Sequence, residues 1–266
     1  MTLLTRRKLL AGGGAAVVAA AGIGAYFVKH PPAAPIGYAV TPDELAKARA
    51  LLAKHISVDA HAHPGRTFVD GAENLAGLVW IYAKLGTFEG RTLADMTAGG
   101  LTAASFAAVS DFQVLGTEGE GLTARRNFEP GEAWASYQRQ IGNLKALATS
   151  GKVHPVKSVA DLAAAKQSGK PGMLLTVEGG DFLEGKPERV ALAHADGVRS
   201  ITLMHYRNNE LGDIITGKPV QGKLSAAGAE VVKAMNAAGM LIDVAHASEA
   251  TALSTIAASS KPVMAS

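Results

Sequence analysis

The sequence predicts an α/β fold, a (β/α)8 TIM-type barrel that is incomplete, with about six βα units present. After residue 40, apolar runs of strand length alternate with segments of helical spacing, as in parallel sheets buried on both faces. Polar residues recur where these runs end, and in a β/α barrel such ends open onto one face. An open doubly wound sheet is the rival fold. It usually carries a glycine-rich loop after its first strand, where this chain has histidines.

The predicted elements follow from local signals. Thr41 is a candidate N-cap and Pro42 suits the first helical position, while Gly197 and Gly239 are typical helix ends. Further helices are predicted at 130–150, 186–197, 225–239 and 248–260. Strands are predicted at 56–60, 101–110 (ambiguous with helix), 172–180, 199–206, 240–248 and 261–266. Because a closed barrel needs eight strands, we expect a fragment of a longer reading frame or a truncated product.

Composition excludes several kinds of chemistry. The chain has 266 residues and a formal net charge of +3, with no basic stripe interleaved with aromatic residues, so no nucleic-acid partner is expected. It has no cysteine, which excludes disulfides, thiolate metal ligands, a cysteine nucleophile and a lipid-modified cysteine anchor.

Residues 1–35 are predicted to be a targeting segment, separate from a partial barrel domain at 36–266. Arg6 and Arg7 precede the uncharged stretch 9–28, which resembles a twin-arginine export signal and predicts a periplasmic protein. About 20 apolar residues could also span a bilayer, so an N-terminal anchor in the inner membrane is the alternative. The sequence leaves open whether the segment is cleaved.

The stretch "SVDAHAHPG" carries His61 and His63 at the end of a predicted strand. Alternate residues of a strand point the same way, and imidazole is the commonest metal ligand, so both can bind one ion. Glu178 ends another strand and its two oxygens can bridge two ions, with His246 serving the second. Zinc accepts such nitrogen and oxygen ligands, and two zinc ions that lie close together can generate hydroxide from bound water at neutral pH.

Five segments together resemble one known family. "VDAHAHPG", "TVEGGDFLEG", "SITLMHYRNNELGD", "LSAAGAEVVKAMNAAGMLIDVAHAS" and "KPVMAS" are similar, in order and spacing, to motifs of the renal (membrane) dipeptidase family of zinc metallopeptidases. The resemblance covers roughly residues 50–266. It implies a β/α barrel with two zinc ions that hydrolyses dipeptides, some with a D-residue at the C-terminal side, through a metal-bridging hydroxide.

The resemblance also implies roles for single residues. His61 and His63 match the ligands of the first zinc, Glu178 the bridging carboxylate, and His246 a ligand of the second zinc. His205 matches the histidine that contacts the substrate and stabilises the tetrahedral oxyanion. We therefore expect His205 and Glu178 to be catalytic. The loop after His205 is expected to line the substrate pocket, and it includes Tyr206 and Arg207.

The chain departs from the family pattern in two ways. Many members have His-x-Asp where this chain has His61 and His63, which replaces a negative ligand by a neutral one. The sequence also stops at Ser266, before a histidine of the second zinc, a carboxylate-binding arginine and a later acid. We expect the isolated chain to bind the first metal better than the second and to have little or no activity.

Two other functions stay open. One is a different binuclear amidohydrolase, such as a lactamase, lactonase or phosphotriesterase, although many of those bridge their metals with a modified lysine rather than a residue like Glu178. The other is a non-catalytic, membrane-tethered remnant that binds metal or a partner. A homodimer is also left open.

Overall fold

The computed structural model describes residues 37–119 and 121–266. The predicted export signal at 1–35 lies outside the described residues. Residues Ala46–Ser266 form one compact unit, which contains all of the predicted site. Helix α2 (Pro42–Lys54) begins at the predicted proline. Within the described ranges, no helix is both long and apolar enough to cross a membrane.

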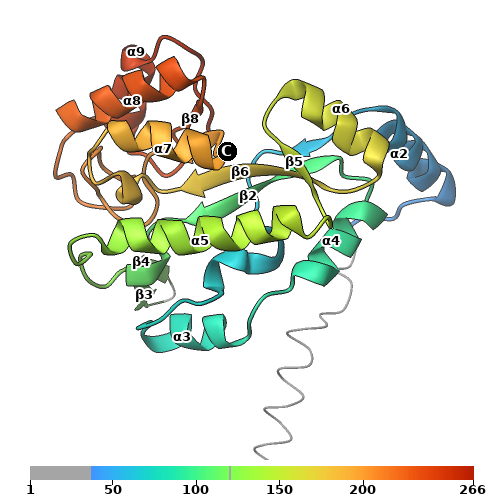
Figure 1. Cartoon of the computed structure of the whole chain (residues 1–266), viewed down its shortest axis with the longest axis horizontal. Coiled ribbons are helices and arrows are strands. Elements are labelled where there is room, and N and C mark those ends of the chain that lie inside the picture. Colours follow the sequence, from blue (N-terminus) through green and yellow to red (C-terminus); the bar gives the residue numbers. More distant parts are fainter. Residues whose placement is uncertain (1–36, 120) are drawn as a thin grey trace, which may run out of the picture. The chain divides into compact units, whose positions relative to one another are not determined.

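A curled parallel sheet carries the predicted site (Figure 1). Its strands run in the order β1-β2-β6-β7-β8, and β5 pairs with the first half of β6. Because the strands are parallel, their carboxyl ends meet at one edge, and the predicted incomplete TIM-type barrel is confirmed. The strands are β1 (Val58–Asp59), β2 (Ala103–Val109), β5 (His154–Val156), β6 (Gly172–Glu178), β7 (Ser200–Thr202) and β8 (Leu241–Asp243).

Helices follow the strands and bury the core. Ser225 and Ser248 cap α8 and α9 by accepting hydrogen bonds from backbone N–H groups three residues on, and Gly197 and Gly239 end α7 and α8 at positive φ. The core includes the fully buried Phe106 of β2. The helices are α5 (Glu132–Thr149), α6 (Val159–Ser168), α7 (Glu188–Asp196), α8 (Ala226–Ala238) and α9 (Glu249–Ala258).

Several elements were not predicted. They are β5, α6, α3 (Gly77–Lys84), α4 (Glu89–Ala98), the hairpin of β3 (Leu115–Glu118) and β4 (Gly121–Ala124), and the 3₁₀ helices η1 (Pro64–Val69), η2 (Phe112–Val114) and η3 (Asp181–Leu183). The ambiguous segment 101–110 contains the central strand β2. The predicted last strand, 261–266, forms a single parallel bridge, between Asp243 and Met264.

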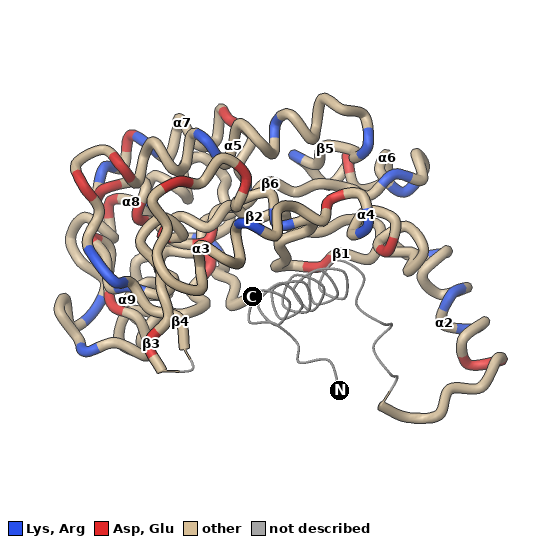
Figure 2. Tube along the Cα trace, turned by 90° about the horizontal axis from the view of Figure 1, so that it is seen from below, with Lys and Arg blue, Asp and Glu red and all other residues tan. Residues whose placement is uncertain are grey.

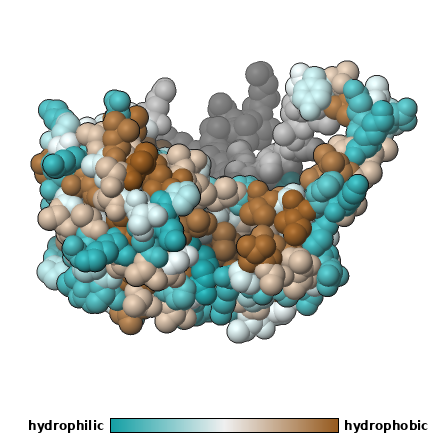
Figure 3. Space-filling view, turned by 90° about the horizontal axis from the view of Figure 1, so that it is seen from above, coloured by the Kyte–Doolittle hydropathy of each residue, from teal (hydrophilic) through white to brown (hydrophobic). Residues whose placement is uncertain are grey.

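The surface is mixed in character. Acidic and basic residues are spread over most elements of the described chain (Figure 2). Apolar side chains reach the surface in separate clusters among hydrophilic ones on the face shown in Figure 3. Exposed apolar residues include Leu192, Leu253 and Ile256 on the helices α7 and α9.

A glutamine of α5 completes the hydrogen bonding of β2 next to the site. Ser110 donates its backbone N–H to the Glu178 carbonyl of β6. The backbone N–H and C=O of Val109 point to the opposite side of β2, where the short strand β1 pairs only with Ala103 and Ala104 and does not reach Val109. Gln140 fills this place: its Oε1 accepts from the Val109 N–H at 2.8 Å and its Nε2 donates to the Val109 carbonyl at 2.8 Å. The Gln140 side chain thereby fixes the strand end that leads to the site.

Replacing Gln140 by leucine is expected to lower the free energy of unfolding by about 2–4 kcal/mol, because two buried backbone groups would lose their partners. Urea unfolding would measure the change. The matched control is Gln167→Leu on the exposed face of α6, expected within about 0.5 kcal/mol of the parent. Equal stability of the two variants would show that Val109 finds another partner.

Candidate metal centre

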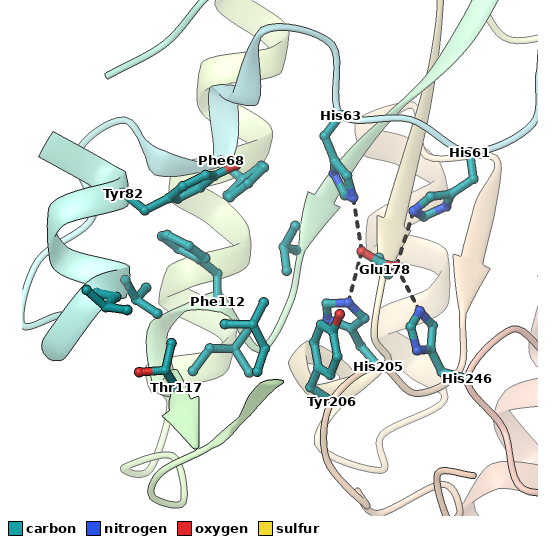
Figure 4. Close-up of a pocket in the computed structure, with 15 residues that line it drawn as sticks. His61, His63, Phe68, Tyr82, Phe112, Thr117, Glu178, His205, Tyr206 and His246 are labelled. Carbon is teal, nitrogen blue, oxygen red and sulfur yellow. Dashed lines mark hydrogen bonds and ion pairs between the residues drawn. The ribbon is translucent and has the colours of Figure 1, made fainter. Parts of the chain in front are cut away.

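Four imidazoles converge on one buried carboxylate at the edge of the sheet (Figure 4). Glu178 is 5% exposed, and each of its oxygens faces two ring nitrogens. Oε1 lies 3.2 Å from Nε2 of His61 and 3.2 Å from Nε2 of His246. Oε2 lies 3.1 Å from Nε2 of His63 and 3.3 Å from Nε2 of His205. The structure therefore brings together the four residues predicted as metal ligands and His205, which was predicted as a catalytic residue in contact with the substrate.

The strand ends put these side chains in place. Glu178 is the last residue of β6, and His205 and His246 each follow a strand, β7 and β8, by three residues. His61 and His63 follow β1. Asp59, the last residue of β1, accepts a hydrogen bond from the His61 backbone N–H through its Oδ1 at 3.2 Å, which fixes the turn after the strand. His246 adopts a φ of 65°, an uncommon conformation for a residue with a side chain, which tends to occur at functional sites.

The donor set fits a bound cation. Nδ1 of His63 lies 3.1 Å from the Ala107 carbonyl oxygen, and Nδ1 of His205 lies 2.7 Å from Oδ1 of Asp111. Both Nδ1 atoms therefore carry a proton, and in the neutral ring each Nε2 offers a lone pair toward Glu178. A lone pair facing a carboxylate oxygen is repulsive unless a proton or a metal ion lies between them. The geometry matches metal ligands whose far nitrogens are hydrogen-bonded.

The structure contains two overlapping sets of candidate metal ligands. Within each set, the ligand atoms all lie within 4.8 Å of one another. The first set is His61, His63 and Glu178, and the second is Glu178, His205 and His246. Glu178 belongs to both, as expected of a bridging carboxylate. The second set places His205 where it could bind a metal, while its sequence-based role as a substrate contact stays a prediction.

Electrostatics favour the charged carboxylate. Burial opposes ionisation of Glu178, but the surrounding imidazoles outweigh it and hold the pKa of this carboxyl far below its usual range. The hydrogen bond to Glu178 raises the pKa of His61. Burial opposes protonation of His205, yet the charges of Asp111 and Glu178 prevail and raise its pKa. A cation at this position would replace the protons that the imidazoles otherwise hold.

The two predicted pocket residues after His205 point to different places. Tyr206 lies in the cavity beside the cluster, and its backbone N–H donates to Oδ2 of Asp111 at 2.9 Å. Arg207 is directed elsewhere, with its Nη1 2.5 Å from Oδ1 of the buried Asp181, in a second cavity. Its contact with a substrate stays a prediction.

Asp111 is the functional residue that the sequence reasoning missed. It is fully buried and holds both the His205 ring and the Tyr206 backbone. The available signal was position: Asp111 directly follows the apolar run 101–110, as the predicted ligands follow theirs. Because the run 101–110 is compatible with a helix as well as a strand, the sequence did not predict that the acid after it lies at the site.

A parallel half-barrel with a His/Glu cluster at its strand ends is typical of metal-dependent enzymes of the β/α-barrel class. Residues 45–266 match the model of the membrane dipeptidase family (peptidase family M19), and the chain belongs to this family. The predicted resemblance is thus confirmed. Among curated relatives, the dipeptidase verJ of Clonostachys rogersoniana is 37% identical over 99 residues, which cover 37% of this chain and 26% of that protein.

Solved structures agree in fold. The superposition with the probable dipeptidase PvdM from Pseudomonas aeruginosa covers 85% of this chain and 55% of the PvdM chain, with 19% identity and a TM-score of 0.64. A metallo peptidase from Rhodobacter sphaeroides, liganded with a phosphinate mimic of the dipeptide L-Ala-D-Ala, matches 79% of this chain and 65% of its own. That match has 16% identity and a TM-score of 0.57. This chain thus spans a quarter to two thirds of these relatives.

Replacing Asp111 by asparagine is expected to weaken zinc binding about 10- to 100-fold, because the His205 ring loses its charged partner. Competition with a chromophoric chelator would measure the affinity. The control is Asp196→Asn, which changes a carboxylate that accepts from the Tyr137 hydroxyl at 2.9 Å, away from the cluster. Unchanged affinity in the Asp111 variant would mean that His205 plays no part in holding the metal.

Proposed function

We propose that this chain carries the catalytic centre of a zinc-dependent dipeptidase with two zinc ions bridged by Glu178. The observation that supports it is one buried carboxylate, each of whose oxygens faces two imidazole nitrogens. Membership of the membrane dipeptidase family supports the peptide substrate. A carboxylate bridge also favours this reaction over the lactamase, lactonase and phosphotriesterase alternatives, many of which use a modified lysine.

Residues of the chain have distinct tasks in this proposal. His61 and His63 would hold the first ion, and His246 the second. Bound zinc would activate a water molecule and polarise the peptide carbonyl. His205 is oriented by Asp111: with a neutral ring its Nε2 would be a further ligand of the second ion, whereas as an imidazolium its Nε2–H would stabilise the negative charge that develops on the carbonyl oxygen. The zinc affinity of the Asp111 variant distinguishes these two roles.

The proposed substrate range includes dipeptides with a D-residue at the C-terminal side. Support comes from the metallo peptidase of the same fold that was solved with a phosphinate mimic of L-Ala-D-Ala. Tyr206 lines the cavity next to the cluster and is placed to contact such a substrate.

The zinc-loaded product of the complete reading frame is expected to hydrolyse members of a panel of L,L- and L,D-dipeptides and to lose activity on chelation, whereas the isolated 266-residue chain is expected to bind zinc with little or no hydrolysis. Glu178→Gln should lower kcat/KM at least about a thousand-fold, because the bridging charge is removed. The control is Glu188→Gln, an exposed acid in the first turn of α7. Turnover of lactones or phosphotriesters alone would contradict the dipeptidase proposal. Zinc binding by the complete product with no hydrolysis at all would favour the non-catalytic remnant.

We also propose that the protein is exported to the periplasm, folded, through the segment 1–35. The Arg6–Arg7 pair ahead of an uncharged stretch supports this. Residues 1–40 fused to a fluorescent protein that folds before export should carry fluorescence to the periplasm. The double variant Arg6→Lys, Arg7→Lys keeps the positive charge of the segment, and its fluorescence should stay in the cytoplasm. The control variant Lys8→Arg should still carry fluorescence to the periplasm. Export of both variants alike would contradict a twin-arginine route. A membrane tether and a homodimer stay predictions.

A further inference from the structure

The cavity beside Glu178 has two chemically different walls. It encloses about 600 Å³, a size typical of small-molecule sites. One wall is the imidazole cluster with Tyr206, and the opposite wall is apolar (Figure 4). The residues of the apolar wall used below are Phe68, Tyr82, Phe112, Leu115, Thr117 and Leu122.

The apolar wall offers no partner for a charged side chain. Among the described residues that line the cavity, Glu178 is the one carboxylate, and none is lysine or arginine. Among the described residues of the apolar wall, the polar side-chain groups are the hydroxyls of Tyr82 and Thr117. A charged group placed here would lose its water without gaining an ion pair, whereas an apolar group would gain from leaving water.

The wall is built before any ligand arrives. Phe68 is 7% exposed and Phe112 4%, and their ring centroids are 4.9 Å apart in an edge-to-face contact. The ring of Phe68 also lies 5.3 Å from that of His63, so the apolar wall adjoins the metal cluster directly. At the mouth, Leu122 is 44% exposed and Tyr82 39% exposed, and both can bury more surface against a ligand.

The hairpin β3–β4 supplies one side of this wall and an internal control. Thr117 is paired with Leu122 across the two strands, and both line the cavity. Gly116 is paired with Thr123 at the neighbouring position. Because side chains alternate along a strand, Thr123 faces away from the cavity.

We propose that this wall is the side-chain subsite of the centre, and that it selects dipeptides with one large apolar or aromatic residue over those with small or charged residues. The inference rests on the proposed dipeptidase function, since it specifies the substrate class of the same cavity. In this proposal the ends of the parallel strands supply the His/Glu cluster, and the side-chain selectivity comes from η1, η2, α3 and the hairpin β3–β4, which lie outside that sheet.

Binding of hydrolysis-resistant phosphinate dipeptide mimics to the full zinc-loaded chain, measured by calorimetry, tests the proposal. The mimics carry a benzyl, methyl or carboxymethyl side chain at the N-terminal or the C-terminal position. At one of the two positions, benzyl is expected to bind at least about ten-fold tighter than methyl. The carboxymethyl mimic is expected to bind more weakly than the methyl one.

Thr117→Phe fills the cavity from the hairpin. It should weaken binding of the benzyl mimic about ten-fold and leave the methyl mimic within about two-fold. Thr123→Phe adds the same bulk on the other face of the hairpin and should change neither. If Thr117→Phe disturbs folding, Leu122→Ala at the exposed mouth serves instead and should reduce the preference for benzyl a few-fold.

The outcomes separate this inference from the proposed function. Equal binding of benzyl and methyl mimics, tighter binding of the carboxymethyl mimic, or a benzyl preference that neither hairpin variant alters would overturn the subsite and leave the dipeptidase proposal standing. Failure of every mimic to bind the zinc-loaded chain would overturn both.

Discussion

A buried carboxylate that faces four imidazoles is the constraint on which the rest of this structure depends. Taking Glu178 out of water is costly, and the cost is offset when positive charge or hydrogen-bond donors lie against its oxygens. Protonated histidines or metal ions can supply that charge. Since the hydrogen bonds of His63 and His205 already fix a proton on each Nδ1, their remaining nitrogens suit a metal ion.

The parallel sheet makes this arrangement possible, and specific hydrogen bonds give it precision. Parallel strands end at a common edge, so residues from four strand ends converge without long loops. Two buried side chains then hold the edge: Gln140 completes the backbone of Val109, and Asp111 follows two residues later and holds the His205 ring. The chain of contacts therefore runs from helix α5 through strand β2 to the cluster. A structural residue such as Gln140 is part of what positions the chemistry.

The sequence was informative where local pattern and chemistry coincide. Apolar runs that end in His or Glu predicted the strand ends, and with them the convergence of His61, Glu178 and His246. It was less informative where structure depends on distant contacts. Strand β5 has only three residues and exists through its pairing with β6. The segment 101–110, which precedes Asp111, was ambiguous between strand and helix. Nothing in the sequence around Arg207 predicts that its guanidinium pairs with the buried Asp181.

The division between sheet and added elements explains why one part of the site was predictable and the other was not. In a chain without cysteine, the side chains best suited to bind zinc are imidazoles and carboxylates at fixed places, so their identities and spacing leave a clear mark on the sequence. An apolar wall can be built from many combinations of side chains, and Phe68, Phe112 and Leu115 look like ordinary core residues until they are seen around a cavity. The same latitude would let one kind of metal centre be combined with different apolar walls, because side chains of the wall can change while Glu178 stays in place.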